Sequence, residues 1–236
     1  MAMHALTGER LLTAWERGRE NAEPWRALRL LETALPGETL SSLAAQPLAR
    51  RNVLLFELHR ISFQDHLDGF TICRRCGSQL EFSISTRQLE EQLQIPGEEA
   101  WAEEAHTWRM RPATTADLIA ALEAGDDAAA QATLLTRTVT RSDAEEFDSP
   151  QPGWLARFER LNASAEIRCT FECNCCGAAE VLDLDIERYL WREVNVAARR
   201  LLAEVHTIAR AHGWSEQSIL SMTSARRTAY LEMLQA

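Results

Sequence analysis

Two short cysteine motifs, far apart in the chain, contain the residue types best suited to binding a metal ion. Both have the form Cys-x-x-Cys-Gly, and we call them the first knuckle (Cys73 to Gly77) and the second knuckle (Cys173 to Gly177). Two residues between thiolates let both sulfur atoms reach one cation about 2.3 Å away, and a left-handed glycine turns N–H groups towards them. Each knuckle supplies half of a tetrahedral site. The sequence therefore predicts one structural zinc site, formed by Cys73, Cys76, Cys173 and Cys176.

The alternative is that each knuckle forms a disulfide or redox pair. The separation of the knuckles is far wider than the about 15–20 residues usual between the halves of such sites. However, the stretch Met1–Arg19 has no apolar core typical of a signal peptide, so we expect a cytoplasmic location. Thiols stay reduced there, which favours a metal over a disulfide.

Four further residues near the knuckles contain possible ligand atoms. Cys169 lies in an alternating stretch, and we expect it to be a small buried hydrophobic side chain. Cys175 lies inside the second knuckle and is an alternative ligand at that position. His59 and His66 precede the first knuckle. We expect them to lie at the surface or beside the site rather than to bind the metal.

Composition limits the classes of protein to which the chain can belong. Its 236 residues are 46% hydrophobic, which is typical of a globular protein. No apolar run approaches the about 18 residues needed to span a bilayer, so no membrane segment is expected. The formal net charge of −10 argues against a general nucleic-acid-binding protein, which needs a basic face for phosphates. Serine, histidine and aspartate are scattered without a readable catalytic set, and we expect no enzyme activity.

Hydrophobic periodicity predicts an α+β fold that is mainly helical. Apolar residues that recur every three or four positions predict helices before the first knuckle, and the longest predicted helix of the chain is Ile186–His212. Alternation predicts strands next to the knuckles, at Gln79–Ser85, Glu166–Glu172 and Ala179–Asp185. Together with the flanks of the first knuckle, these strands are expected to form one small antiparallel, zinc-ribbon-like sheet. After Gly213, two short helices form a C-terminal helical hairpin.

The residues between the knuckles are expected to form an inserted, mainly helical lobe. Pro96 and Gly97 open a predicted acidic loop that ends at Trp101, and Trp108–Pro112 is expected to be extended. Helices follow a cap at Thr114 or Thr115 and a start at Asp126 or Asp127. The stretch Arg141–Gly153 lacks periodicity and is predicted to be a loop, and a third helix begins near Trp154.

These expectations divide the chain into four regions. Residues 1–66 form an N-terminal helical region, residues 67–86 and 165–186 form the zinc-ribbon-like core, residues 87–164 form the inserted lobe, and residues 187–236 form the long helix and the C-terminal hairpin.

Several stretches resemble one known family. The C-terminal pattern includes Glu204-Val-His206, His-Gly213-Trp214-Ser215-Glu216, Ile219-Leu220, Ala225-Arg226-Arg227 and Tyr230-Leu231. Matching stretches lie near Trp15, at Pro47 to Arg51 and at Arg111 to Leu118. This pattern is similar to that of the T-even-type phage baseplate hub assembly proteins, which also occur in phage-tail-like contractile injection systems. Zinc-binding relatives have Cys-Pro-x-Cys-Gly, where this chain has Arg74 and Asn174 in place of proline.

The resemblance implies a role in building or forming the baseplate of a contractile tail, as an assembly chaperone or a resident structural protein. It also implies that the partners are other baseplate proteins and that the protein is cytoplasmic or part of a particle assembled there. The expected binding face is the C-terminal hairpin, because tryptophan, tyrosine and arginine often dominate interfaces; its residues would be Trp214, Arg226, Arg227 and Tyr230. These residues could instead close the hairpin on itself. A regulatory or nucleic-acid-binding zinc ribbon is the alternative function, which a basic stripe near the knuckles would favour.

Overall fold

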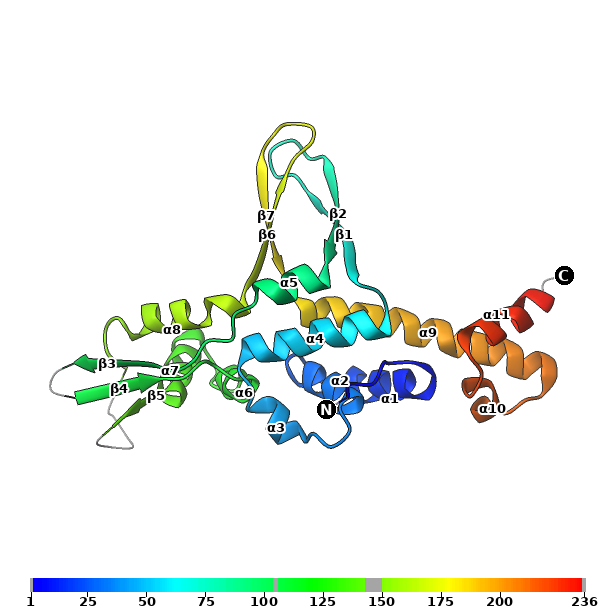
Figure 1. The fold of residues 1–236 in the computed structure, drawn as a ribbon, viewed down its shortest axis with the longest axis horizontal. Coiled ribbons are helices and arrows are strands. Elements are labelled where there is room, and N and C mark those ends of the chain that lie inside the picture. Colours follow the sequence, from blue (N-terminus) through cyan, green and yellow to red (C-terminus); the bar gives the residue numbers. More distant parts are fainter. Residues whose placement is uncertain (1, 104–105, 143–149, 235–236) are drawn as a thin grey trace.

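The computed structural model describes residues 2–103, 106–142 and 150–234, which form a helical body with a projecting arm and an inserted lobe (Figure 1). The predicted α+β class, its helical majority and its small antiparallel sheets are confirmed. Within the described residues, no helix combines the length and the hydropathy that crossing a membrane requires.

The helical body is built from both ends of the chain. Its N-terminal helices are α1 (Gly8–Arg19), α2 (Trp25–Ala34), α3 (Leu40–Ala44) and α4 (Leu48–Ser62). Helices α1, α2 and α4 pack against α9 (Ile186–His212), whose bounds are those predicted from its apolar stripe, and α3 packs against α2. Asp185 caps the start of α9 by accepting the N–H of Arg188, and Gly213, at φ 71°, ends it in the left-handed conformation. The main hydrophobic core lies between these helices.

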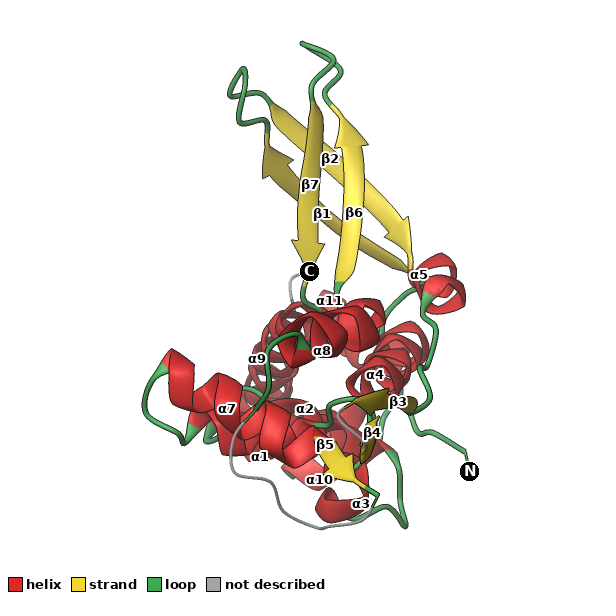
Figure 2. Ribbon diagram, turned by 90° about the vertical axis from the view of Figure 1, so that its left-hand side faces the viewer, coloured by secondary structure: helices red, strands yellow, loops and turns green. Residues whose placement is uncertain are grey.

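The arm consists of two antiparallel hairpins that project from the body (Figures 1 and 2). The first pairs β1 (His66–Ile72) with β2 (Gln79–Ser85), and the second pairs β6 (Ile167–Glu172) with β7 (Ala179–Leu184). The prediction of one sheet is wrong, because the hairpins remain separate two-stranded sheets. They meet through side chains: the rings of Phe82 and Phe171 stack with centroids 5.3 Å apart.

The inserted lobe contains a small sheet that its sequence pattern did not predict, although the expected extended stretch at Trp108 does lie in one of its strands. Its helices are α5 (Thr86–Gln92), α6 (Thr115–Leu122), α7 (Asp127–Thr138), α8 (Trp154–Asn162) and the 3-10 turn η1 (Ala163–Ala165). A three-stranded sheet has the order β3 (Glu99–Glu103), β4 (His106–Met110), β5 (Val139–Arg141). The predicted acidic loop from Pro96 to Trp101 is correct only as far as Glu98, because β3 begins at Glu99 and Trp101 pairs with Trp108 in that sheet. The sheet and α7 and α8 share a separate hydrophobic cluster, made of Trp108, Met110, Leu135, Val139 and Trp154.

The predicted loop Arg141–Gly153 lies partly outside the described residues. Its first residue belongs to β5, residues 143–149 are not described, and Gly153 precedes α8 in the left-handed conformation, with φ 87°. The division of the chain into four regions stays a prediction. The separate cluster of the lobe supports it, whereas Ala116 and Ile119 of α6 pack against the main core.

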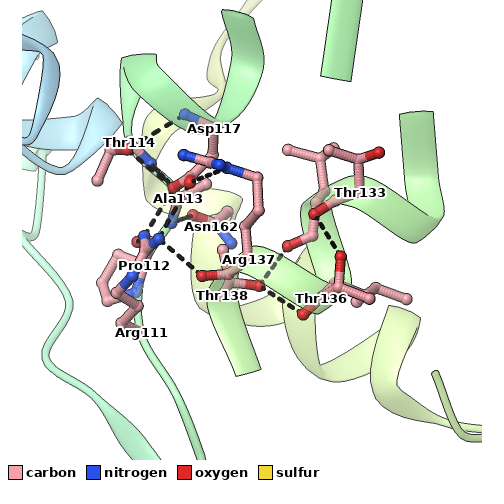
Figure 3. Close-up of polar contacts among 12 residues, drawn as sticks. Arg111, Pro112, Ala113, Thr114, Asp117, Thr133, Thr136, Arg137, Thr138 and Asn162 are labelled. Atoms are coloured by element: carbon pink, nitrogen blue, oxygen red, sulfur yellow. Dashed lines mark hydrogen bonds and ion pairs between the residues drawn. The ribbon is translucent and has the colours of Figure 1, made fainter. Parts of the chain in front are cut away.

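A buried carboxylate organises the lobe where β4, α6 and α7 meet (Figure 3). Asp117 is fully buried; its carboxylate pairs with Arg111 at 2.6 Å and with Arg137 at 2.9 Å. It also accepts the N–H and the hydroxyl of Thr114, the residue that caps α6. Burial alone would raise the pKa of Asp117, but the bonds from Arg111 and Thr114 lower it to about 2.

The chain ends in two short helices that pack on the far end of α9. These are α10 (Glu216–Leu220), capped by Ser215, and α11 (Ser224–Met233), capped by Thr223. Both contact α9, so the predicted hairpin is packed on the long helix. Ile219 of α10 is fully buried and belongs to the main core.

Candidate metal centre

The two knuckles have the same backbone geometry at the tips of their hairpins. In the first, the N–H of Gly77 donates to the carbonyl of Cys73 at 2.8 Å, and the N–H of Cys73 donates to the carbonyl of Ser78 at 2.9 Å. In the second, Gly177 and Cys173 make the equivalent bonds, both 2.8 Å long. Both glycines are left-handed, with φ 76° and 68°, a conformation that costs other residues energy. Each tight turn therefore holds its two cysteines on the same side of the hairpin.

The four predicted cysteines converge where the two tips meet. Their sulfur atoms all lie within 4.8 Å of one another. The Sγ atoms of Cys73 and Cys176 are 3.7 Å apart, and those of Cys76 and Cys173 are 3.6 Å apart. A tetrahedron with metal–sulfur bonds of about 2.3 Å has sulfur–sulfur edges of about 3.8 Å. A disulfide needs about 2.05 Å, and all four cysteines are free. The cluster therefore has the dimensions of a four-thiolate metal site.

The arm shields part of this cluster from solvent. Cys73 and Cys173 are buried, Cys176 is half-buried and Cys76 is exposed. Leu80 packs against the two buried cysteines. The four thiols therefore lie at the edge of the arm, with two of them buried and at least one in contact with solvent.

Hydrogen bonding separates the acidities of these thiols. Bonds from Ser78 lower the pKa of Cys76 to about 6. For Cys73, the N–H of Cys76 favours the thiolate, but burial and the hydrogen bonds to Cys76 and Glu180 raise the pKa to about 12. Thiols that share one negative charge do not ionise together. A bound metal removes this competition, because it takes every thiol in its deprotonated form.

Glu180 is a site residue that the sequence analysis missed. It occupies an inward position of β7 and is only 8% exposed. Its Oε1 accepts the backbone N–H of Arg74, in the other hairpin, at 2.8 Å. The sequence does contain a signal for it, because the alternation of the strand places this glutamate on the buried face. A buried carboxylate requires a partner.

The remaining candidate ligands lie outside the cluster. Cys175 is exposed, and Cys169 is half-buried in β6, where burial raises the pKa of its thiol. His59 is fully buried in α4 against Phe63 and Tyr189, and burial lowers its pKa to about 4. His66 is the exposed first residue of β1, at the end of the hairpin opposite its knuckle.

Two of the four predicted partner-binding residues, Trp214 and Tyr230, contact each other next to the end of α9. The ring of Trp214 stacks on His212 at 4.6 Å and meets the edge of Tyr230 at 4.9 Å. Arg226 is exposed. Arg227 is instead 7% exposed, and its Nε donates to Glu204 at 3.0 Å. For Arg227 the structure therefore favours the intramolecular role, and its guanidinium is not available to a partner.

No protein-family model, curated protein or solved structure matches the chain. The class of protein is therefore defined by its own fold and site. The chain is a mixed α+β protein in which four cysteines, from two hairpins far apart in the sequence, form one cluster suited to a metal ion.

Proposed function

We propose that the cluster holds one structural zinc ion that joins the two hairpins into a single arm. The observation that supports this most directly is the 3.6–3.7 Å separation of sulfur atoms from different hairpins. Four thiolates in a tetrahedral arrangement are typical of zinc, which carries no redox chemistry. The two hairpins pair no strands with each other, so a metal ion bound to both would add a strong link to their side-chain contacts.

The role of such a zinc is structural and not catalytic. A zinc ion with four protein ligands has no open position for water or substrate, so it cannot activate a nucleophile. The proposal therefore assigns the protein a binding function without enzyme activity.

We further propose that the protein is a component or an assembly factor of a contractile-tail baseplate, where it binds other baseplate proteins. This proposal rests on the C-terminal stretch that resembles the baseplate family. Several of its residues have defined structural roles. Gly213 ends α9, Ser215 caps α10, and Trp214 packs between His212 and Tyr230. The exposed Arg226, close in sequence to this aromatic cluster, provides a candidate contact for a partner.

The test is co-purification from cells that produce the contractile particle. Affinity-tagged protein is expected to isolate baseplate subunits, identified by mass spectrometry, and deletion of its gene is expected to abolish particle assembly. Arg226→Glu should weaken co-purification without unfolding the protein, whereas Arg87→Glu, an exposed change on α5, should not. Normal particles in the deletion strain would rule out the baseplate role, although they would leave the zinc proposal intact.

The alternative, a zinc ribbon that binds nucleic acid, requires a basic face near the knuckles. The described arm has Arg74 and Arg75 at the first tip. Its second hairpin is acidic, however, with a single arginine among five carboxylates: Arg168, Glu166, Glu172, Glu180, Asp183 and Asp185. Such a surface repels phosphates, so the charge of the arm favours the protein-binding proposal.

A further inference from the structure

The outer face of α9 is a charged surface with an uneven distribution of sign. Figure 1 shows α9 running along the body from the base of the arm to α10 and α11. Its buried side chains lie on one side: Leu190, Val194, Leu201, Val205 and Ile208. At 100° per residue, Arg192 and Arg210 point in the same direction, opposite to that side. They mark the centre of the outer half of the helix.

All fully charged side chains on this outer half are positive. It carries five arginines, namely Arg188, Arg192, Arg199, Arg200 and Arg210. The glutamates of α9, at positions 187, 193 and 204, all fall on the other half by the same rotation. The protein has 35 acidic and 25 basic residues, so a random helix face would be more acidic than basic. The segregation therefore indicates a surface with a specific electrostatic role.

Three of these arginines form no ion pair with any described residue. Arg188 pairs with Glu23 at 3.4 Å and Arg200 with Glu204 at 3.2 Å. In the described part of the chain, no carboxylate lies within ion-pair distance of Arg192, Arg199 or Arg210. All three side chains are exposed. The Nε of Arg199 donates to the Oδ1 of Asn195 at 3.3 Å, which leaves its terminal amino groups to pair with charges from another molecule.

The spacing along this face matches the seam of a helix–helix contact. Exposed residues recur at intervals of four and three, and we call this set the α9 stripe: Arg192, Val196, Arg199, Ala203, His206 and Arg210. A repeat of that kind keeps one line of residues facing a second helix. Val196 is 65% exposed and, with the small Ala203, offers apolar contact between the charges.

We propose that the α9 stripe binds an acidic amphipathic helix of a partner protein. Carboxylates of that helix would pair with Arg192, Arg199 and Arg210, while its apolar residues cover Val196 and Ala203. A membrane fits less well, because the apolar side of α9 is buried in the core and cannot enter lipid. Duplex DNA also fits less well, because the acidic second hairpin adjoins the start of α9. The proposal stands whether or not the protein belongs to a baseplate.

The test uses the full-length protein and fluorescence anisotropy of a labelled peptide. The peptide is a helix of about 21 residues, long enough to cover the stripe at 1.5 Å per residue, with glutamate at the positions flanking a leucine and alanine seam. Its controls are the same peptide with lysine for glutamate and a labelled DNA duplex. The variant is Arg192→Glu/Arg199→Glu/Arg210→Glu. The matched variant, Arg50→Glu/Arg87→Glu/Arg109→Glu, makes the same change in net charge at exposed positions elsewhere.

We expect the acidic peptide to bind the wild type and the matched variant equally, and the stripe variant at least roughly tenfold more weakly, as expected for the loss of three ion pairs. Added salt should weaken the binding. Circular dichroism and thermal melting verify that both variants are folded. Absence of acidic-peptide binding, equal binding of the lysine peptide, equal loss in both variants, or tighter binding of DNA would each overturn the proposal.

Discussion

The backbone N–H of Arg74 donates to the carboxylate of Glu180 at 2.8 Å, and this bond links the first knuckle to the second hairpin. Glu180 lies four residues after Cys176, so the bond is adjacent to the cysteine cluster. It is a second, metal-independent connection between two hairpins that share no strand pairing. The arm is therefore held together by side chains that come from opposite ends of a long insertion.

Replacing Glu180 should weaken the arm without removing a ligand. Glu180→Ala leaves the N–H of Arg74 without its acceptor, and a hydrogen bond to a charged group contributes about 1.5–3 kcal/mol. We expect faster loss of metal to a chelator and a lower unfolding midpoint in urea. Glu180→Gln keeps an acceptor, so its metal retention and its unfolding midpoint should fall less than those of Glu180→Ala. Glu172→Gln, at an exposed position of β6, should change neither property. Equal behaviour of all three variants would contradict the role of this bond.

Gly69 makes room for the aromatic contact between the hairpins. It faces Phe82 across the first hairpin, and a Cβ atom at Gly69 would lie 2.6 Å from the Phe82 ring. Gly69→Ala must therefore displace Phe82 from its stack on Phe171, at a cost of about 1–3 kcal/mol. Urea unfolding measures the loss. Gly97→Ala is the control, since nothing lies within 4 Å of that position; an equal effect there would count against this interpretation.

The Asp117 network should make stability depend on acidic pH. The folded pKa is about 2, below the ordinary value of 3.8, so the carboxylate stabilises the fold fully above pH 3.8 and loses this contribution as pH falls towards 2. The contribution is about 2 kcal/mol at most, because Arg111 and Arg137 are partly exposed and solvent screens them. The free-energy difference between wild type and Asp117→Asn in urea should therefore shrink between pH 4 and pH 2.

Asp127→Asn is the matched control for this pH series, because Asp127 is exposed in the first turn of α7. Its difference from the wild type should be small throughout. A difference for Asp117→Asn that stays constant down to pH 2 would show that the ion pairs do not control the acid response.

The two neighbouring arginines of α11 should behave differently. Arg227 and Glu204 are 8% and 12% exposed at their side chains, and breaking a buried pair costs about 3 kcal/mol or more. Arg227→Ala should therefore lower the melting temperature, whereas Arg226→Ala, at an exposed position, should leave it nearly unchanged. If Arg227→Ala melts like the wild type, the ion pair does not hold α11 on α9, and the partner-binding hypothesis for Arg227 becomes open again.

The sequence was most informative where local chemistry determines structure. The Cys-x-x-Cys-Gly motifs identified all four cysteines of the cluster, because a turn and its ligands are encoded within five residues. The apolar stripe of Ile186–His212 predicted α9 with its correct ends. Long-range relationships were not encoded in this way. Period-two alternation identified the strands of the arm but not the packing of two hairpins face to face.

Two other features lay beyond local patterns. The short strand Glu99–Glu103 contains acidic residues and follows a proline and a glycine, so its sequence resembles a loop; pairing with β4 makes it a strand. The buried Arg227 of α11 pairs with Glu204, which lies two helices earlier in the chain, on α9. Spacing within α11 alone could not distinguish it from the exposed Arg226.

The most direct test of the central claim is the metal content of the purified protein, measured by elemental mass spectrometry together with free-thiol titration. We expect one zinc ion per chain in the wild type and in Cys175→Ser, because Cys175 lies outside the cluster. Cys73→Ser and Cys176→Ser should lose the zinc, since each removes one of four ligands. Folded wild-type protein that contains no zinc and has a disulfide between Cys73 and Cys76 would contradict the account.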